Sequence, residues 1–373
     1  MNVPVNEPLL NGNEKKYLNE CIDTGWISSE GPFVRKFEQQ MAEYIGKKHA
    51  VAVTNGTAAL ELAIEALGIS NGDEVIMPSF TIISCAQAII KAGAKPVLID
   101  SEFDTFNMRV EDIESKITKS TKAIMVVHIY GLPVDMDLVL ALAKKYNLKI
   151  IEDAAEMHGQ TYKGKLCGSF GDISIFSFYP NKHITTGEGG MVLMNDTDLL
   201  DKCKSLRNLG FSTDPNKRFI HDKLGWNLRM TNLQAAVGVA QLERIEEFVS
   251  KKKWIGEMYQ NLLSDIEEIN LPIKQKHFSD NIYWVFAITL KDSCSKNAKD
   301  VMAELSKKGI GNRPFFYPMH QQPVFNNRGL FIGELHPNST KLYERGFYIP
   351  SGMAISEEQI KQVSRVLHEI FTK

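Results

Sequence analysis

The sequence predicts an α/β fold in which a mostly parallel central sheet is flanked by helices and followed by a smaller C-terminal α+β unit. Two observations support this prediction. Short apolar runs, typical of strands covered on both faces, alternate with helical patterns from about residue 48 onward. From residue 231 the pattern becomes long and helical. Alternating β and α segments favour a parallel sheet with helices on both sides.

The elements follow one another with short connections. The predicted strands of the sheet are 49–53, 74–78, 95–100, 123–131, 148–155, 173–178 and 190–195. The predicted helices between them are 57–68, 83–93 and 136–146. The C-terminal part has predicted helices at 231–263, 299–309 and 357–371 and a strand at 283–290. We therefore expect a large domain at 1–250 and a small domain at 251–373, packed together because no flexible linker separates them.

Composition excludes several classes of protein. The 373 residues carry 43 basic and 45 acidic side chains, so there is no basic excess to indicate a nucleic-acid or acidic-membrane partner. The five cysteines are scattered and form no CxxC pair, which argues against a disulfide framework or a metal site. No signal-peptide pattern and no apolar run of membrane length is visible. We expect a cytoplasmic protein.

The stretch TNGTAAL (54–60) joins a predicted strand to a predicted helix through a Gly-Thr turn. Helix N-termini expose N–H groups and the positive end of the helix dipole, which suits a phosphate. The alternative is that Thr54 or Asn55 simply caps the helix.

The stretch IIEDAAEMHG (150–159) places Glu152 and Asp153 at the carboxyl end of an apolar strand. Ligands of open α/β sheets bind at that edge. A carboxylate there suits a cationic partner such as a pyridinium nitrogen. Alternatively, it caps the element that follows.

The stretch FSFYPNKHITTGEGG (176–190) places Lys182 between a strand and a run of small residues. A lysine amine can hold an aldehyde cofactor as a Schiff base, and small residues let a flat ligand approach the backbone. Ser177 could donate to a phosphate. The alternative is an ordinary surface lysine. No GxxxxGK[ST] motif is present, which disfavours a nucleoside triphosphate.

The order of these three sites matters most. A phosphate turn, a carboxylate about 100 residues later and a lysine 29 residues after Asp153 are the three contacts that pyridoxal phosphate requires. Asp153 would keep the ring nitrogen protonated, and the protonated ring would then stabilise a carbanion.

The same motifs resemble the DegT-like family of pyridoxal phosphate-dependent sugar aminotransferases, which have the fold-type-I aminotransferase architecture. The resemblance covers nearly the whole chain. It is carried by TNGTAAL, IEDAAE and the Lys182 stretch together with GWISSEGPFVRKFE (25–38), GDEVIMPSFT (72–81), GWNLRMTNLQAA (225–236) and RPFFYPMH (313–320). The family implies the roles of individual residues.

By this resemblance Lys182 is the Schiff-base lysine and proton shuttle, Asp153 partners the pyridine nitrogen and Glu156 faces the ring hydroxyl. The residues matching phosphate contacts are Gly56, Thr57 and Ser177. Asn227 matches a residue that reaches the cofactor phosphate of the other subunit, which implies a homodimer with shared active sites.

Further residues lie on the substrate side in the family. These are Trp26, Ser28, Arg313 and His320. Arg229 is either an anion contact for the amino donor or part of a structural ion pair. Ile82 stands where family members often stack Tyr or Trp on the cofactor, so the ring contact is apolar unless Phe80 substitutes. His183 follows the lysine and is expected to have a positioning or structural role.

The resemblance implies transfer of an amino group from L-glutamate to a nucleotide-linked keto-sugar. The favoured acceptor is GDP-4-keto-6-deoxymannose, which would become GDP-perosamine for surface polysaccharide. The alternatives are another keto acceptor, such as a UDP- or dTDP-sugar or a small phosphorylated ketone, and a sugar dehydratase. A non-catalytic binding protein would not need Lys182.

Overall fold

A seven-stranded sheet forms the centre of the computed structural model, which describes residues 2–212 and 214–371. Its strands lie in the order β1-β9-β8-β5-β4-β2-β3. Their bounds are β1 His49–Val53, β2 Glu74–Pro78, β3 Lys95–Ile99, β4 Thr121–Val127, β5 Lys149–Asp153, β8 Ile173–Ser177 and β9 Gly190–Met194. Only β9 runs against its neighbours, so the sheet is mostly parallel, as predicted.

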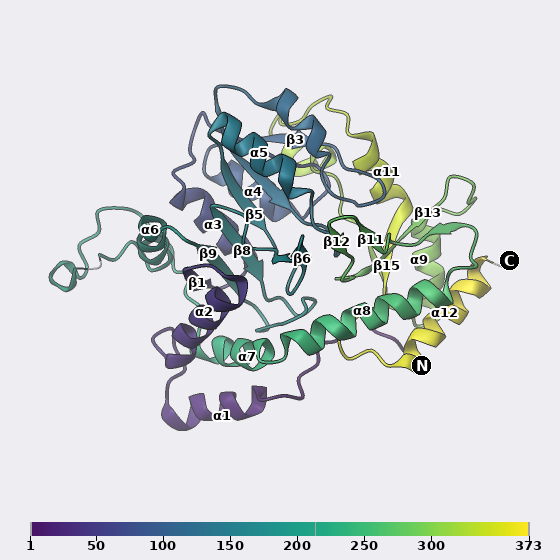
Figure 1. The fold of residues 1–373 in the computed structure, drawn as a ribbon, viewed down its shortest axis with the longest axis horizontal. Helices are drawn as coiled ribbons and strands as arrows, with labels where there is room; N and C mark the ends of the chain where they lie inside the picture. Colours follow the sequence, from purple (N-terminus) through teal and green to yellow (C-terminus); the bar gives the residue numbers. More distant parts are fainter. Residues whose placement is uncertain (1, 213, 372–373) are drawn as a thin grey trace.

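Helices cover both faces of this sheet (Figure 1). One face packs on α2 (Pro32–Ile45), α5 (Met136–Tyr146), α7 (Asn232–Leu242) and the start of α8 (Ile245–Leu262). The other packs on α3 (Gly56–Ala66), α4 (Ile83–Lys91) and α6 (Thr197–Arg207). Alternate residues of one strand enter opposite cores: Ala50 and Ala52 on the first face, Val51 and Val53 on the second.

The C-terminal part is an α+β unit with its own core. A four-stranded sheet has the order β10-β13-β15-β14. Its strands are β10 Ile269–Asn270, β13 Phe286–Leu290, β14 Arg313–Pro314 and β15 Gly346–Ile349. The helices α9 (Ala298–Lys307), α11 (Pro337–Arg345) and α12 (Glu357–Phe371) accompany it, with the short α10 (Pro323–Asn326) between them. Figure 1 shows α8 running from the central sheet to this unit.

Short hairpins and an N-terminal helix complete the fold. The hairpins are β6–β7 (Thr161–Tyr162 and Lys165–Leu166) and β11–β12 (Gln275–Lys276 and Ser279–Asp280), and α1 spans Glu14–Thr24. None of the helices in the described residues is long and apolar enough to cross a membrane.

The predicted helix at 231–263 is two helices, because the chain breaks between α7 and α8 at Glu243 and Arg244. The uniform helical pattern hides this break, since both pieces bury apolar side chains against the same core. The predicted domain boundary near residue 250 lies inside α8, and the division of the chain there stays a prediction.

Candidate active site

A cavity of about 360 Å³ opens at the carboxyl ends of the central strands. The loops after β1, β2, β5 and β8 all reach it, as expected for a ligand site in an open α/β sheet. Residues of the C-terminal unit form the remaining wall of the cavity. Its lining includes Gly56, Thr57, Ile82, Asp153, Glu156, Ser177, Lys182, Trp284, Phe316 and Tyr348. Six residues predicted to hold the cofactor therefore share one cavity.

Among the residues that the structure describes, Lys182 is the only lysine that lines this cavity. Only 10% of its side chain is exposed, and its Nζ lies 4.0 Å from Glu156 Oε1. The same Nζ lies 4.0 Å from the centroid of the Trp284 ring. Burial lowers the pKa of Lys182, whereas the nearby carboxylates of Glu156 and Asp153 act in the opposite direction. A lysine with a lowered pKa can act as a nucleophile and a base.

Asp153 ends β5 and is buried at the floor of the cavity. Its Oδ1 accepts a hydrogen bond from the Ala155 N–H at 3.0 Å. Its Oδ2 accepts one from the Cys85 thiol at 3.4 Å. Burial raises the pKa of Asp153, and the hydrogen bond from Ala155 and the charge of Lys182 oppose that effect. A buried carboxylate of this kind favours a cationic ligand group.

Glu156 follows β5 and faces Lys182 across the cavity. Its Oε2 accepts a hydrogen bond from the Tyr130 N–H at 2.8 Å. Burial raises the pKa of Glu156 to about 8, against the opposing charge of Lys182. Near neutral pH the side chain therefore carries a proton in the free site and can donate a hydrogen bond to an oxygen of a ligand.

The N-terminus of α3 forms the other end of the cavity. Asn55 caps the helix by accepting a hydrogen bond from the Ala58 N–H at 2.8 Å, so the capping alternative is confirmed for Asn55. Gly56 is required here, since a Cβ atom at this position would lie 2.8 Å from Cβ of Ser177. Thr57 Oγ1 lies 2.8 Å from Ser84 Oγ. Free N–H groups at a helix start and these hydroxyls are suited to an anion.

These residues fit pyridoxal phosphate. The glycine at the α3 N-terminus lets the helix start lie close to Ser177, so that backbone N–H groups and a hydroxyl can meet a phosphate. Asp153 supplies a carboxylate for a ring nitrogen and Lys182 supplies an amine for an aldehyde. The three groups line one cavity, so a single ligand can reach all of them.

Glu152, the second carboxylate of the IIEDAAE stretch, does not line the cavity. It accepts hydrogen bonds from the N–H groups of Gly168, Phe170 and Gly171 and from Ser174 Oγ. Burial alone would raise its pKa, but these bonds and His128 lower it. His128 and Cys167 lie close enough to offer a metal three ligands with Glu152. Because the carboxylate is already bonded on both oxygens, we assign this cluster a structural role.

Asn227 and Arg229 do not line this cavity. Arg229 lines a separate hollow and donates from Nη1 to Asn208 Oδ1 at 2.6 Å. Asn227 pairs with Asn208 in an isolated bridge. The neighbouring Trp26 is 48% exposed, and the carbonyl of Ser28 accepts from the Asn232 N–H at 3.0 Å. The predicted roles of these four residues therefore require a bound substrate or a second subunit.

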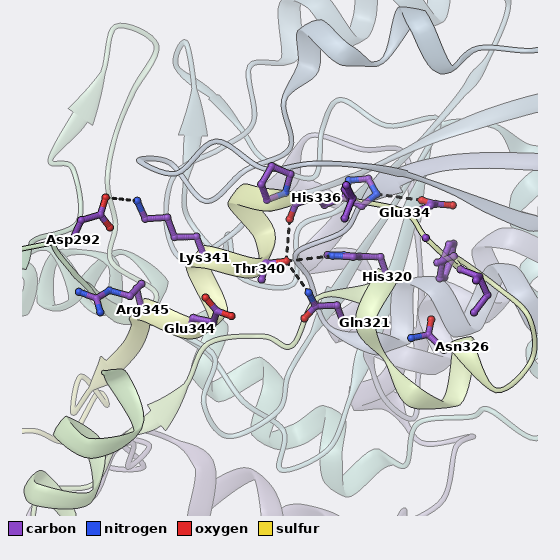
Figure 2. A pocket seen from close by; sticks show the side chains of 15 residues that line it. Asp292, His320, Gln321, Asn326, Glu334, His336, Thr340, Lys341, Glu344 and Arg345 are labelled. Carbon is purple, nitrogen blue, oxygen red and sulfur yellow. Dashed lines mark hydrogen bonds and ion pairs between the residues drawn. The ribbon is translucent and has the colours of Figure 1, made fainter. Parts of the chain in front are cut away.

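His320 and Arg313 also lie outside the cavity. Arg313 is exposed and stands opposite Tyr348 on the paired strand β15. His320 is buried, with Nδ1 2.8 Å from Ser79 Oγ and Nε2 3.3 Å from Thr340 Oγ1. It lines a different pocket, of about 740 Å³, and Figure 2 shows it facing Thr340. A substrate contact by His320 therefore stays a prediction.

The burial of Ile82 and Phe80 shows which of these two side chains can contact a ligand in the cavity. Ile82 is 45% exposed and lines the cavity. Phe80 is fully buried and packs edge-on against Tyr130 with ring centroids 5.9 Å apart. Phe80 therefore does not replace the missing aromatic ring. His183 is fully buried behind Lys182 and points into the core, where burial holds its pKa well below the ordinary value.

Several residues at the site were not predicted from the sequence, and two of them contact predicted residues directly. Cys85 contacts Asp153, and Trp284 covers Lys182. Cys85 lies three residues after Ile82, one helical turn away, so the helix period could have placed it near the cavity. Trp284 comes from the C-terminal unit, and nothing in its local pattern indicates the contact.

The profile of the DegT/DnrJ/EryC1/StrS aminotransferase family matches residues 8–368. The chain belongs to this family, and the predicted class of pyridoxal phosphate-dependent aminotransferase is confirmed. A protein of Escherichia coli O157:H7 called GDP-perosamine synthase is 43% identical over 370 residues, covering 99% of both chains. One of Vibrio cholerae with the same name is 42% identical over 372 residues, covering 99% of both.

Solved structures show the same fold. An aminotransferase from Psychrobacter cryohalolentis has a TM-score of 0.91 and 31% identity, with 98% of each chain covered. DesV of S. venezuelae, solved in complex with a ketimine intermediate, has a TM-score of 0.89 and 29% identity, with 97% of this chain and 95% of that chain covered. The predicted fold-type-I aminotransferase architecture is therefore confirmed.

Proposed function

We propose that this enzyme transfers the amino group of L-glutamate to GDP-4-keto-6-deoxymannose and forms GDP-perosamine, a 4-amino sugar for surface polysaccharide. The observation that carries the transfer chemistry is the buried Lys182 amine, which shares a cavity with Asp153 and the α3 N-terminus. Support for the acceptor comes from the full-length relatives called GDP-perosamine synthase at 42–43% identity.

Each residue has a distinct task in this proposal. Bound pyridoxal phosphate supplies an aldehyde carbon for an amine and a ring that takes up the electron pair of a broken C–H bond. Gly56, Thr57 and Ser177 would hold its phosphate, and Asp153 would hold a proton on its ring nitrogen. Lys182 would hold its aldehyde carbon in the resting enzyme. Once released, its neutral amine removes the proton from the α-carbon of glutamate.

The lowered pKa of Lys182 supports this assignment. A lowered pKa leaves more of the amine neutral than in an ordinary exposed lysine, and a neutral amine can accept a proton. The neighbouring Glu156 is suited to a hydrogen bond with the ring hydroxyl because it can donate or accept near its pKa of about 8.

Absorption spectroscopy with L-glutamate tests the donor half of the reaction. The protein loaded with pyridoxal phosphate should be yellow, should bleach on addition of glutamate and should release 2-oxoglutarate. Lys182→Ala should not turn over, and full turnover by that variant would contradict the assignment. A panel of GDP-, UDP- and dTDP-keto-sugars and a small phosphorylated ketone, followed by mass spectrometry, tests the acceptor. Release of water without consumption of glutamate would instead show a dehydratase.

We also propose a homodimer in which Asn227 of the partner subunit completes the phosphate site. Large apolar side chains are exposed around Asn227, as expected for a surface that another chain covers. They include Trp26, Ile27, Leu209, Phe219, Ile220, Leu224 and Trp226. Figure 1 shows the segment after α6 extending away from the central sheet.

Mixing two impaired variants tests the shared site. If Asn227 acts across the interface, Lys182→Ala and Asn227→Ala chains should regain activity when mixed, because one of the two sites becomes wholly native. If Asn227 acts in its own chain, mixing should restore nothing. We propose a cytoplasmic location, which agrees with five free, buried cysteine thiols.

A further inference from the structure

Trp284 contacts the reactive amine from the C-terminal unit. Its ring centroid lies 4.0 Å from Lys182 Nζ, well within the range of a cation–π contact. Lys182 Nζ lies equally far from Glu156 Oε1, so the amine is held between an indole face and a carboxyl group. Only 3% of the Trp284 surface is exposed, which leaves little water to weaken the contact.

Trp284 is fixed at both ends. Its indole Nε1–H donates to the carbonyl of Asn181, the residue before the lysine, at 2.8 Å. Its own carbonyl accepts from the buried Lys252 amine at 2.8 Å, and Lys252 also donates to the carbonyl of Ser351 at 2.6 Å. The Trp284 ring also packs on Tyr130, with ring centroids 5.9 Å apart. A side chain anchored in this way presents one fixed face to Lys182.

We propose that the Trp284 ring is the resting place of the Lys182 amine whenever this amine is not bonded to the cofactor. Trp284 is then a positioning residue that keeps the general base beside the reacting carbon. This inference rests on the proposed role of Lys182 as the proton carrier.

The proton balance of the step explains the need for such a contact. The neutral amine takes a proton from the α-carbon of the donor and becomes an ammonium group in a buried site. Burial opposes this charge, and the carboxyl groups of Glu156 and Asp153 offset only part of that effect, since the pKa of Lys182 is still lowered. The face of an indole attracts a cation without taking its proton away, so the ammonium group is stabilised and can still give the proton to the next carbon.

A titration of the cofactor-free protein tests the inference without any turnover. Lysines labelled with carbon-13 at Cε report their charge by NMR, and Lys182→Arg and Lys252→Arg identify the two buried signals. Trp284→Leu should make Lys182 about tenfold more acidic, because the charged amine loses the ring face. Trp284→Phe, which keeps a smaller ring, should give an intermediate value.

Phe316→Leu is the matched control, since Phe316 lines the same cavity and packs on Tyr130. It should leave the acidity of Lys182 unchanged. The other charged or titratable groups that line the cavity or interact electrostatically near the amine are Asp153, Glu156, Cys85, His158, His183, Lys252, Tyr179, Glu188 and Tyr348. All of these groups remain in each variant, so a change confined to the Trp284 variants points to the ring itself.

The pH dependence of kcat gives a second readout. The acid limb of the profile should move to lower pH in Trp284→Leu, because the more acidic amine becomes neutral sooner. A lower kcat with an unmoved limb, together with an unchanged NMR titration, would show that Trp284 only fills space and would overturn the inference. If Lys182→Ala still forms the yellow complex and turns over, the proposed function fails instead. Circular dichroism checks that each variant is folded. If Trp284→Leu does not fold, Trp284→Phe still provides the test.

Discussion

The Cys85 thiol donates a hydrogen bond to Asp153 Oδ2 at 3.4 Å, and both groups are buried, with Asp153 lining the cavity. Burial raises the pKa of Cys85 well above its ordinary value, with the Asp153 charge adding to the effect. The thiol therefore remains a donor at all ordinary pH values. With the Ala155 N–H bonded to Oδ1, each oxygen of Asp153 has one fixed donor, and the carboxylate has a defined orientation.

Replacing Asp153 with Asn should slow the glutamate half-reaction far more than it weakens cofactor binding. An amide cannot hold a proton on a pyridine nitrogen by charge, so the ring becomes a poorer acceptor of electrons. We expect a loss of at least about 100-fold, similar to the loss of one well-placed electrostatic group. Stopped-flow absorbance after mixing with glutamate measures the rate.

Cys85→Ala distinguishes the effect of the Asp153 charge from the effect of its orientation. It removes one weak donor and leaves the carboxylate, so the half-reaction should slow by only about tenfold or less. Equal losses for Cys85→Ala and Asp153→Asn would mean that the charge of Asp153 is not what matters.

Gly56→Ala should weaken the affinity for pyridoxal phosphate by at least about tenfold. The added methyl group would lie 2.8 Å from Cβ of Ser177, so the two segments that form the phosphate end must move apart. Equilibrium titration of the cofactor-free protein, followed by absorbance, gives the dissociation constant.

A second substitution distinguishes a steric cause from a chemical one. Ser177→Gly in the Gly56→Ala background removes the colliding Cβ atom together with one hydroxyl. If the collision is the cause, the double variant should bind the cofactor about as well as Ser177→Gly alone. If the affinity losses of the two single variants simply add in the double variant, the collision between residue 56 and Ser177 is not the cause of the weaker binding.

Much of the fold could be predicted because strand patterns are local. The apolar runs that became β1, β2 and β5 are continuous and end in turn residues, and their predicted bounds are within two residues of the observed ones. The three separate motifs meet in one cavity because the carboxyl ends of parallel strands share one edge of the sheet. Lys182, Asp153 and Gly56 were therefore predictable as a group.

Contacts between distant segments could not be predicted in this way. Trp284 reaches Lys182 because the segment before β13 packs into a core shared with the central sheet, a relationship that no local spacing encodes. The break between α7 and α8 likewise depends on packing, since Glu243 and Arg244 carry no Pro or Gly signal. The placement of His320 against Ser79 and Thr340 also follows from tertiary contacts.

Ile82→Phe should make the protein retain pyridoxal phosphate longer. Ile82 lines the cavity and is 45% exposed, so a ring there has room to lie against a flat ligand. An aromatic pair contributes about 0.5–1.5 kcal/mol beyond simple burial, which corresponds to a roughly two- to tenfold slower release. Loss of absorbance during dialysis measures the release rate. Leu138→Phe, on the exposed side of α5, is the control and should change nothing.

The imidazole of His158 should make the protein sensitive to acid. It is buried behind the active site between Phe176 and Phe178, with ring centroids 5.1 and 5.6 Å away. Burial lowers its pKa to about 3, and the charge of Lys182 adds to the effect. The unfolded chain binds a proton at this residue below pH 6.5, whereas the folded chain does not. Stability is therefore lost as the pH falls from about 6.5 toward 3.

His158→Phe removes this proton uptake while keeping a ring between the two phenylalanines. The native protein should lose about 2 kcal/mol more unfolding free energy than the variant between pH 7 and pH 5. Urea unfolding followed by circular dichroism at both pH values measures the difference. His183 keeps its own acid sensitivity in the variant, because burial also lowers its pKa, so part of the pH dependence must remain. His277→Gln changes an exposed imidazole and should leave the pH dependence as it is. If the two variants respond to acid alike, His158 is not held neutral by burial.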